Sequence, residues 1–87
     1  MFKRRVFLVT FDPPEGGGIG GFDWYYDRTA ADARFDALVA EDDGYRVREW
    51  WDFVPTNWTV NEVTDYLEDA FIENDPDGAP IRDNKEA

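Results

Sequence analysis

The sequence RVFLVTFD, which runs from Arg5 to Asp12, decides the fold of this chain. Successive side chains of a strand point to opposite faces of its sheet, and both alternating sets of this segment are largely apolar. The two sets are Val6, Leu8 and Thr10 on one side and Phe7, Val9 and Phe11 on the other. Two apolar faces are typical of a central strand. We therefore expect this segment at the centre of a sheet, ending at Pro13 and Pro14.

Two further segments alternate in the same way. Residues 22–27 (FDWYYD) predict a second strand with one wet face, paired antiparallel with the first. Residues 45–54 (YRVREWWDFV) predict a third strand. Its faces are Tyr45, Val47, Trp51 and Phe53 on one side and Arg46, Arg48, Trp50 and Asp52 on the other. By this parity we expect Trp51 in the core and Trp50 on the opposite face, which is either covered by a helix or open as a docking surface.

Helical periodicity marks two other segments. Thr29 is expected to cap a first helix that ends at Gly44. Residues 59–62 (TVNE) form a capping box that opens a second helix. The inward side chains are Ala31, Phe35, Leu38 and Val39 in the first helix and Val60, Val63, Leu67, Ala70 and Phe71 in the second.

The order strand, strand, helix, strand, helix predicts a small two-layer α+β domain over residues 1–73. Its antiparallel-type sheet is expected to have three strands, with the first helix crossing over to place the third strand beside the first. Residues 74–87 are polar and contain two prolines, and we expect them to form a flexible tail.

Composition favours binding over catalysis. The chain has twenty Asp and Glu and only nine Lys and Arg, which gives a net charge of -11. Its four Trp, four Tyr and seven Phe nevertheless supply enough apolar surface for a core. The chain contains no His, Cys, Ser or Gln, which excludes Ser-His and Cys-His nucleophiles and thiolate metal sites. We expect a cytoplasmic, non-enzymatic protein without a cofactor, whose partner is a basic protein surface and neither nucleic acid nor a membrane.

Three motifs could carry chemistry, and each is weak. Gly16, Gly18 and Gly21 satisfy G-x-G-x-x-G, but an extended segment follows where a dinucleotide site needs a helix. Residues 73–78 match the first half of a calcium loop, but Asn84 stands where the bidentate carboxylate belongs. Glu49 and Asp52, a candidate acid and base pair, fall on opposite faces of the third strand by parity.

An acidic row on the second helix is the sharper feature. Its members, at helical spacing and without an intervening cation, are Glu62, Asp65, Glu68, Asp69 and Glu73. The first helix and its end carry a second acidic set, namely Asp32, Asp36, Glu41, Asp42 and Asp43. Both sets are candidate partner-binding residues, together with Arg46, Arg48 and Trp50. A solvated surface, or an acidic composition that the host gives to all its proteins, explains the charge equally well.

The acidic row, the run Glu41-Asp42-Asp43 and the lack of nucleophiles give the chain its resemblance to anti-CRISPR proteins and other DNA mimics, small acidic proteins of phages and mobile elements. The likeness covers size and charge, with no alignable motif, so no site residue follows from it. It implies a stoichiometric inhibitor that occupies the basic nucleic-acid channel of a CRISPR effector. The Arg46, Arg48 and Trp50 cluster departs from a pure mimic and indicates a mixed interface. The alternative is a homodimeric structural or assembly protein that uses an exposed aromatic sheet face.

Overall fold

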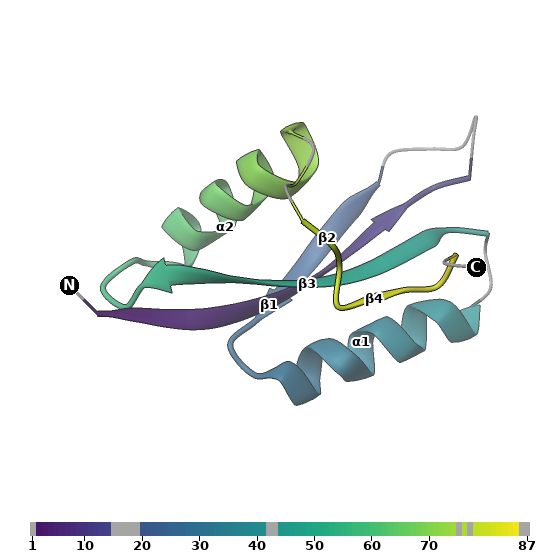
Figure 1. The fold of residues 1–87 in the computed structure, drawn as a ribbon, viewed down its shortest axis with the longest axis horizontal. Helices are drawn as coiled ribbons and strands as arrows, with labels where there is room; N and C mark the ends of the chain where they lie inside the picture. Colours follow the sequence, from purple (N-terminus) through teal and green to yellow (C-terminus); the bar gives the residue numbers. More distant parts are fainter. Residues whose placement is uncertain (1, 15–19, 42–43, 75, 77, 86–87) are drawn as a thin grey trace.

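A computed structural model of the chain describes residues 2–14, 20–41, 44–74, 76 and 78–85. The architecture is α+β, as predicted, with two helices and an antiparallel sheet (Figure 1). In chain order the elements are β1 (Lys3–Asp12), β2 (Gly21–Tyr25), α1 (Arg28–Glu41), β3 (Arg46–Pro55), α2 (Val60–Glu68), the π-helical turn η1 (Asp69–Glu73) and β4 (Arg82–Asp83).

β1 is central, as its two apolar faces predicted. It pairs antiparallel with β2 on one side and with β3 on the other, so that Leu8 lies between Trp24 and Trp50. α1 connects these two outer neighbours of β1 and crosses over the sheet, which confirms the expected connection.

The sheet has four strands in the described residues, not three, in the order β2-β1-β3-β4. β4 pairs with Arg48 and Glu49 of β3. A two-residue strand is too short to show alternation in the sequence, so the pattern at Arg82 and Asp83 gave no signal. The division of the chain at residue 73 stays a prediction.

The two helices cover opposite faces of the sheet, and each closes its own core (Figure 1). The prediction of two layers is therefore wrong, because a sheet with apolar side chains on both faces is covered by a helix on each side and the domain has three layers. The α2 side buries Val6, Leu8, Trp50, Val54, Val63 and Leu67. The α1 side buries Phe7, Val9, Ala31, Phe35 and Val47. The described helices are too short or too polar to cross a membrane.

The helix starts follow local hydrogen bonding. The capping box of α2 is confirmed, because Thr59 Oγ1 accepts a bond from the Glu62 amide and Glu62 Oε1 accepts one from the Thr59 amide. At α1 the expected cap, Thr29, is wrong. The Asp27 carboxylate accepts the Thr29 amide at 3.1 Å, and the Asp27 carbonyl accepts the Ala31 amide, so the cap is Asp27.

The assignment of the paired tryptophans is also wrong. Trp50 is only 6% exposed and packs against Phe71 of η1, whereas Trp51 is 46% exposed. Parity placed the two rings on opposite faces correctly. It could not show how far each helix reaches along its face: α2 and η1 cover Trp50, and α1 leaves Trp51 uncovered.

Candidate protein interface

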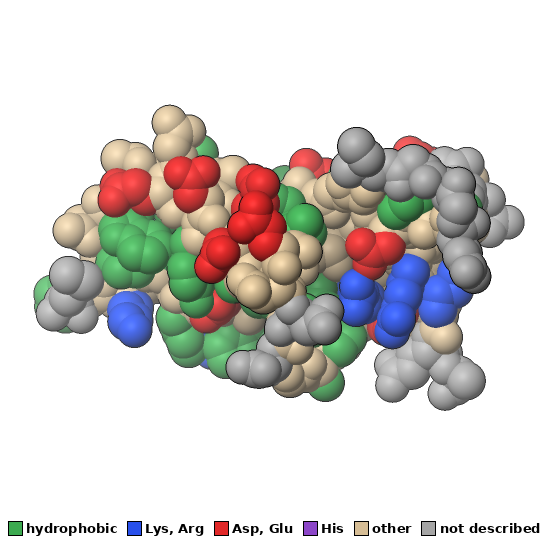
Figure 2. Space-filling view, turned by 90° about the horizontal axis from the view of Figure 1, so that it is seen from above, with side chains coloured by type: hydrophobic (Ala, Val, Ile, Leu, Met, Phe, Trp, Pro, Cys, Tyr) green, Lys and Arg blue, Asp and Glu red, His purple; other side chains and the backbone are tan. Residues whose placement is uncertain are grey.

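Five carboxylates form the outer side of α2 and η1, and we call them the acidic ridge. They belong to Glu62, Asp65, Glu68, Asp69 and Glu73, and all five residues are exposed. Burial of Val63 and Leu67 fixes the rotation of the helix and turns the carboxylates outward. Figure 2 looks down on this side and shows acidic side chains gathered over α2. At 1.5 Å per residue the ridge is about 16 Å long.

Within the described residues, the ridge carboxylates have no Lys or Arg nitrogen within 4 Å. Glu62 uses one oxygen in the capping box, and Asp69 Oδ1 accepts a long 3.4 Å bond from Asn74. The ridge therefore presents uncompensated negative charge to any partner that approaches α2.

The acidic residues of α1 are placed differently. Asp32 lies 3.7 Å from Arg28 and 3.6 Å from Arg82, and Asp36 lies 3.1 Å from Arg82. Glu41 is exposed, whereas Asp42 and Asp43 lie outside the described residues. Because α1 and α2 cover opposite faces, the structure does not join these carboxylates and the ridge into one surface.

Arg46, Arg48 and Trp50 are committed to the fold. Arg46 binds Asp83 at 2.6 Å, and this hydrogen bond holds the pKa of Asp83 below its usual value. Arg48 binds Asp12, and Trp50 Nε1 donates to Thr10 Oγ1 at 3.1 Å inside the α2-side core. Trp50 therefore has little surface to offer a partner.

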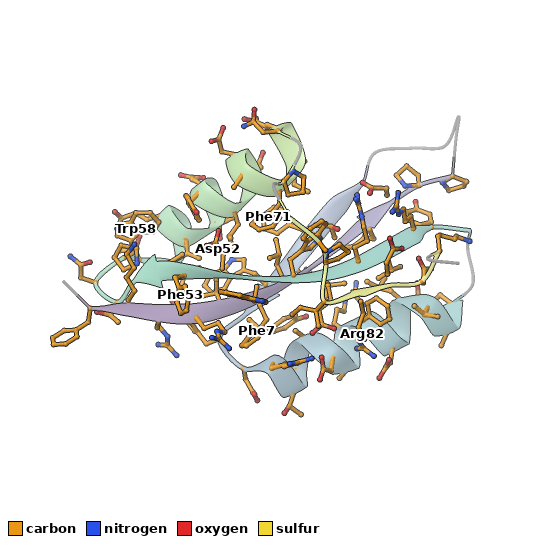
Figure 3. The ribbon with its side chains drawn as sticks, in the orientation of Figure 1. Phe7, Asp52, Phe53, Trp58, Phe71 and Arg82 are labelled. Carbon is orange, nitrogen blue, oxygen red and sulfur yellow. The ribbon has the colours of Figure 1, made fainter. Side chains whose placement is uncertain are left out.

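A buried carboxylate lies on the other face of β3. The Glu49 side chain is completely buried, and Arg82 Nε donates to its Oε1 at 3.0 Å. Arg82, which Figure 3 labels, also donates to Asp36, and its guanidinium lies 4.1 Å from the centroid of the Phe35 ring. Burial, together with the neighbouring Asp32 carboxyl, raises the pKa of Glu49 to about 7.

Glu49 and Asp52 lie on opposite faces of β3, as parity predicted, so they cannot flank one substrate bond. Asp52 accepts a 2.8 Å bond from the Tyr66 hydroxyl on the α2 side. Burial and this bond raise the pKa of Tyr66 to about 12.

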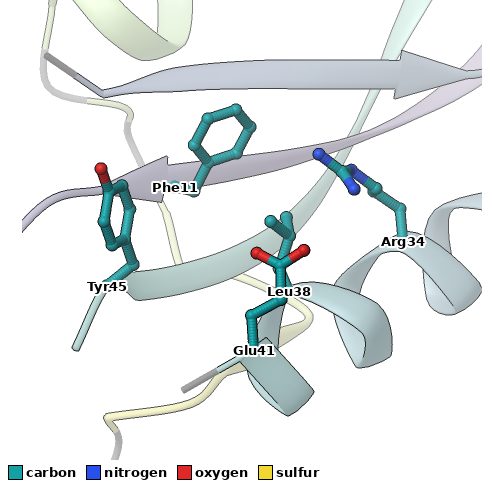
Figure 4. Close-up of a pocket in the computed structure, with 5 residues that line it drawn as sticks. All are labelled: Phe11, Arg34, Leu38, Glu41 and Tyr45. Atoms are coloured by element: carbon teal, nitrogen blue, oxygen red, sulfur yellow. The ribbon is translucent and has the colours of Figure 1, made fainter. Parts of the chain in front are cut away.

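A small cavity of about 230 Å³ opens between α1 and the sheet (Figure 4). Its walls are Phe11, Arg34, Leu38, Glu41 and Tyr45. Arg34 Nε already donates to Asp23 at 2.8 Å. A carboxylate, a phenol and a paired guanidinium around so small a volume supply no nucleophile with an adjacent base.

The exposed aromatic surface of the sheet lies at Trp51 and Phe53, with their ring centroids 5.2 Å apart. The Arg5 guanidinium lies 4.6 Å from the Trp51 ring centroid. We call these three residues the aromatic patch; Figure 3 labels Phe53 among them. The sequence placed Trp51 and Phe53 on one face, but it assigned them to the core and missed the pairing with Arg5.

The remaining motifs lie largely outside the described residues. Most of the glycine loop and two members of the calcium loop, Asp75 and Asp77, lie outside the described residues. Of the three motif glycines only Gly21 is described, and it opens β2 in an extended segment. Among the described residues no three acidic, His or Cys side chains are grouped so that they could hold a metal ion.

Comparison of the chain with known protein families, with curated protein sequences and with solved structures found no match.

Proposed function

We propose that this chain is a non-enzymatic binding protein whose acidic ridge occupies a basic, nucleic-acid-binding surface of another protein. The observation that carries the proposal is the ridge itself: five exposed carboxylates on one helix side, with no cation beside them in the described structure. Like charges one helical turn apart destabilise a helix by a few tenths of a kcal/mol per pair. Lys and Arg side chains of a partner would reverse this cost.

The geometry limits the kind of mimicry. Ridge carboxylates one turn apart lie about 6 Å from each other along the axis, whereas phosphates of one DNA strand repeat about every 3.4 Å. Matching a duplex would require both acidic helices on one side, and here they lie on opposite faces of the sheet. The ridge therefore suits one wall of a basic channel, as a single row of negative charge.

A CRISPR effector complex, whose heteroduplex channel is positively charged, is the first partner to test. The experiment is a competition assay, in which the protein displaces a labelled nucleic acid from the effector at low and at high salt. We expect displacement at low salt that weakens steeply as salt rises, since screening acts on the ridge. If the protein displaces no labelled nucleic acid from the effector or from other basic nucleic-acid-binding proteins at low salt, the proposal is rejected.

A second candidate function, a homodimeric assembly protein, is favoured by the aromatic patch. Trp51 is 46% and Phe53 43% exposed on a sheet face that α1 leaves open. Exposed aromatic and Arg side chains are enriched in binding hot spots. Sedimentation of the wild type and of Trp51→Thr tests this candidate. A dimer that persists at high salt and dissociates in the variant supports it, and a wild-type monomer at high concentration rejects it.

A further inference from the structure

A shallow groove of about 480 Å³ lies where β2 turns into α1, close to the start of α2. Its walls are Trp24, Tyr25, Tyr26, Asp27, Ala30 and Val60. Val60 is 61% exposed and Tyr26 is 38% exposed, so apolar and aromatic surface is open to solvent here. Of these six residues only Asp27 has a charged side chain.

The aromatic rings are arranged to accept a flat cation. The Trp24 and Tyr26 ring centroids are 5.0 Å apart with an interplanar angle of 88°, so two ring systems meet at a corner. Trp24 is fixed in place because its Nε1 donates to Thr64 Oγ1 at 2.8 Å. Tyr26 already stacks with a guanidinium of this chain, since Arg4 lies 3.7 Å from its ring centroid. Arg4 is not a wall of the groove.

The charge of the groove also favours a cation. Asp27 Oδ1 caps α1, and within the described residues no Lys or Arg forms an ion pair with this carboxylate. Val60 opens α2, and the first ridge residues, Glu62 and Asp65, follow within two turns of the same helix. The groove therefore continues the negatively charged surface and adds aromatic rings to it.

We propose that this groove seats an arginine side chain of the basic partner, with its guanidinium against Trp24 and Tyr26 and facing Asp27. Arginine fits better than lysine because its planar guanidinium stacks on aromatic faces while it pairs with a carboxylate. The proposal rests on the proposed function, because it supplies a specific anchor for the partner that the ridge attracts.

The test is an NMR titration of the whole chain with three blocked tripeptides, in which arginine, citrulline or norleucine stands between two glycines. We expect saturable shifts of the amides of residues 24–27 and 60 with the arginine peptide, and binding at least about fivefold weaker with the neutral citrulline peptide. Equal binding of the citrulline or norleucine peptide would overturn the proposal, as would shifts that spare the groove.

Matched variants separate the groove from its surroundings. Asp27→Asn keeps the helix cap and removes the charge, and Tyr26→Leu removes an exposed ring. Both should weaken binding of the arginine peptide by about fivefold, whereas Glu41→Gln, which removes the same charge from the far end of α1, should not. If Glu41→Gln weakens binding as much as Asp27→Asn, the groove is not the site. If the chain displaces nucleic acid from the effector but does not bind the arginine peptide at the groove, the groove proposal alone is rejected. If the chain binds the peptide at the groove but displaces no nucleic acid, the ridge proposal alone is rejected.

Discussion

Arg82 of the short strand β4 donates a 3.0 Å hydrogen bond to Oε1 of Glu49, a carboxylate with no exposed surface in the middle of β3. Among the residues that the structure describes, neither the other carboxylate oxygen, Glu49 Oε2, nor Oδ1 of the neighbouring Asp32 has a hydrogen-bond partner. A proton shared between these two carboxyls would satisfy both oxygens. The stability of the fold therefore depends on pH, through the protonation of Glu49, and on the C-terminal segment, which supplies Arg82.

The first prediction concerns Glu49→Gln. The pKa of Glu49 in the folded chain is about 7, against an ordinary value of 4.5, so between these values the folded state holds a proton that the unfolded state has lost. The free energy of unfolding should therefore fall by roughly 2 to 3 kcal/mol as pH rises through this window. Gln resembles the protonated acid, since its oxygen can accept from Arg82 and its amide can donate to Asp32.

The measurement is urea unfolding of wild type and Glu49→Gln at about pH 5 and about pH 8. The variant should match the wild type at the lower pH, exceed it at the higher pH and lose the dependence on pH. The same slope in both proteins would show that Glu49 does not titrate in this window.

The second prediction concerns Arg82→Met. The variant keeps much of the apolar stem over Phe35 but leaves the ionised Glu49 carboxylate without a cation. We expect the free energy of unfolding at pH 8 to fall by about 2 kcal/mol. This is less than the effect of breaking a fully buried ion pair, because the Arg82 side chain is 35% exposed. At pH 5, where Glu49 is protonated, the loss should shrink. Adding Glu49→Gln should restore stability at pH 8, and failure to do so would mean that Arg82 acts through other contacts.

The third prediction separates the two adjacent tryptophans. Trp50→Ala should lower the free energy of unfolding by roughly 3 to 5 kcal/mol, because it leaves a cavity in the α2-side core and removes the hydrogen-bond donor of Thr10 Oγ1. Trp51→Ala removes a half-exposed ring and should cost about 1 kcal/mol. Chemical denaturation followed by far-UV circular dichroism measures both. The reverse order would show that the faces of β3 are covered the other way round.

Local patterns predicted the elements well. The two-faced segment around Leu8 identified the central strand, and the capping box at Thr59 fixed the start of α2. Both signals lie within a few residues, where chain geometry alone determines the outcome. Parity also separated Trp50 from Trp51 and Glu49 from Asp52.

The sequence could not supply what depends on distant packing. Trp50 is buried and Trp51 is exposed because the two helices cover different parts of the two sheet faces. The periodicity of the sequence does not encode which part of a face a helix covers. Arg82 comes 33 residues after its partner Glu49, in a segment whose composition predicted a tail. The groove between β2, α1 and α2 combines Trp24 and Tyr26 with Val60, residues that are adjacent only in the folded chain.

The most direct test of the acidic ridge is a binding titration against a CRISPR effector complex, or another basic nucleic-acid-binding protein that the chain is found to inhibit. The ridge variant carries Glu62→Gln, Asp65→Asn, Asp69→Asn and Glu73→Gln. The first of these changes can keep the capping box, because the amide oxygen of a glutamine also accepts the Thr59 amide. The matched control removes four acidic charges that do not belong to the ridge, through Glu41→Gln, Asp42→Asn, Asp43→Asn and Glu86→Gln.

Wild type, ridge variant and control are compared at about 50 and about 300 mM salt, a range over which the Debye length shrinks by roughly half. The account predicts that the ridge variant folds normally, binds about a hundredfold more weakly at low salt and depends little on salt, while the control behaves like the wild type. Equal affinity of ridge variant and wild type at both salts, or an equal loss in the control, would contradict the claim that the ridge is the binding surface.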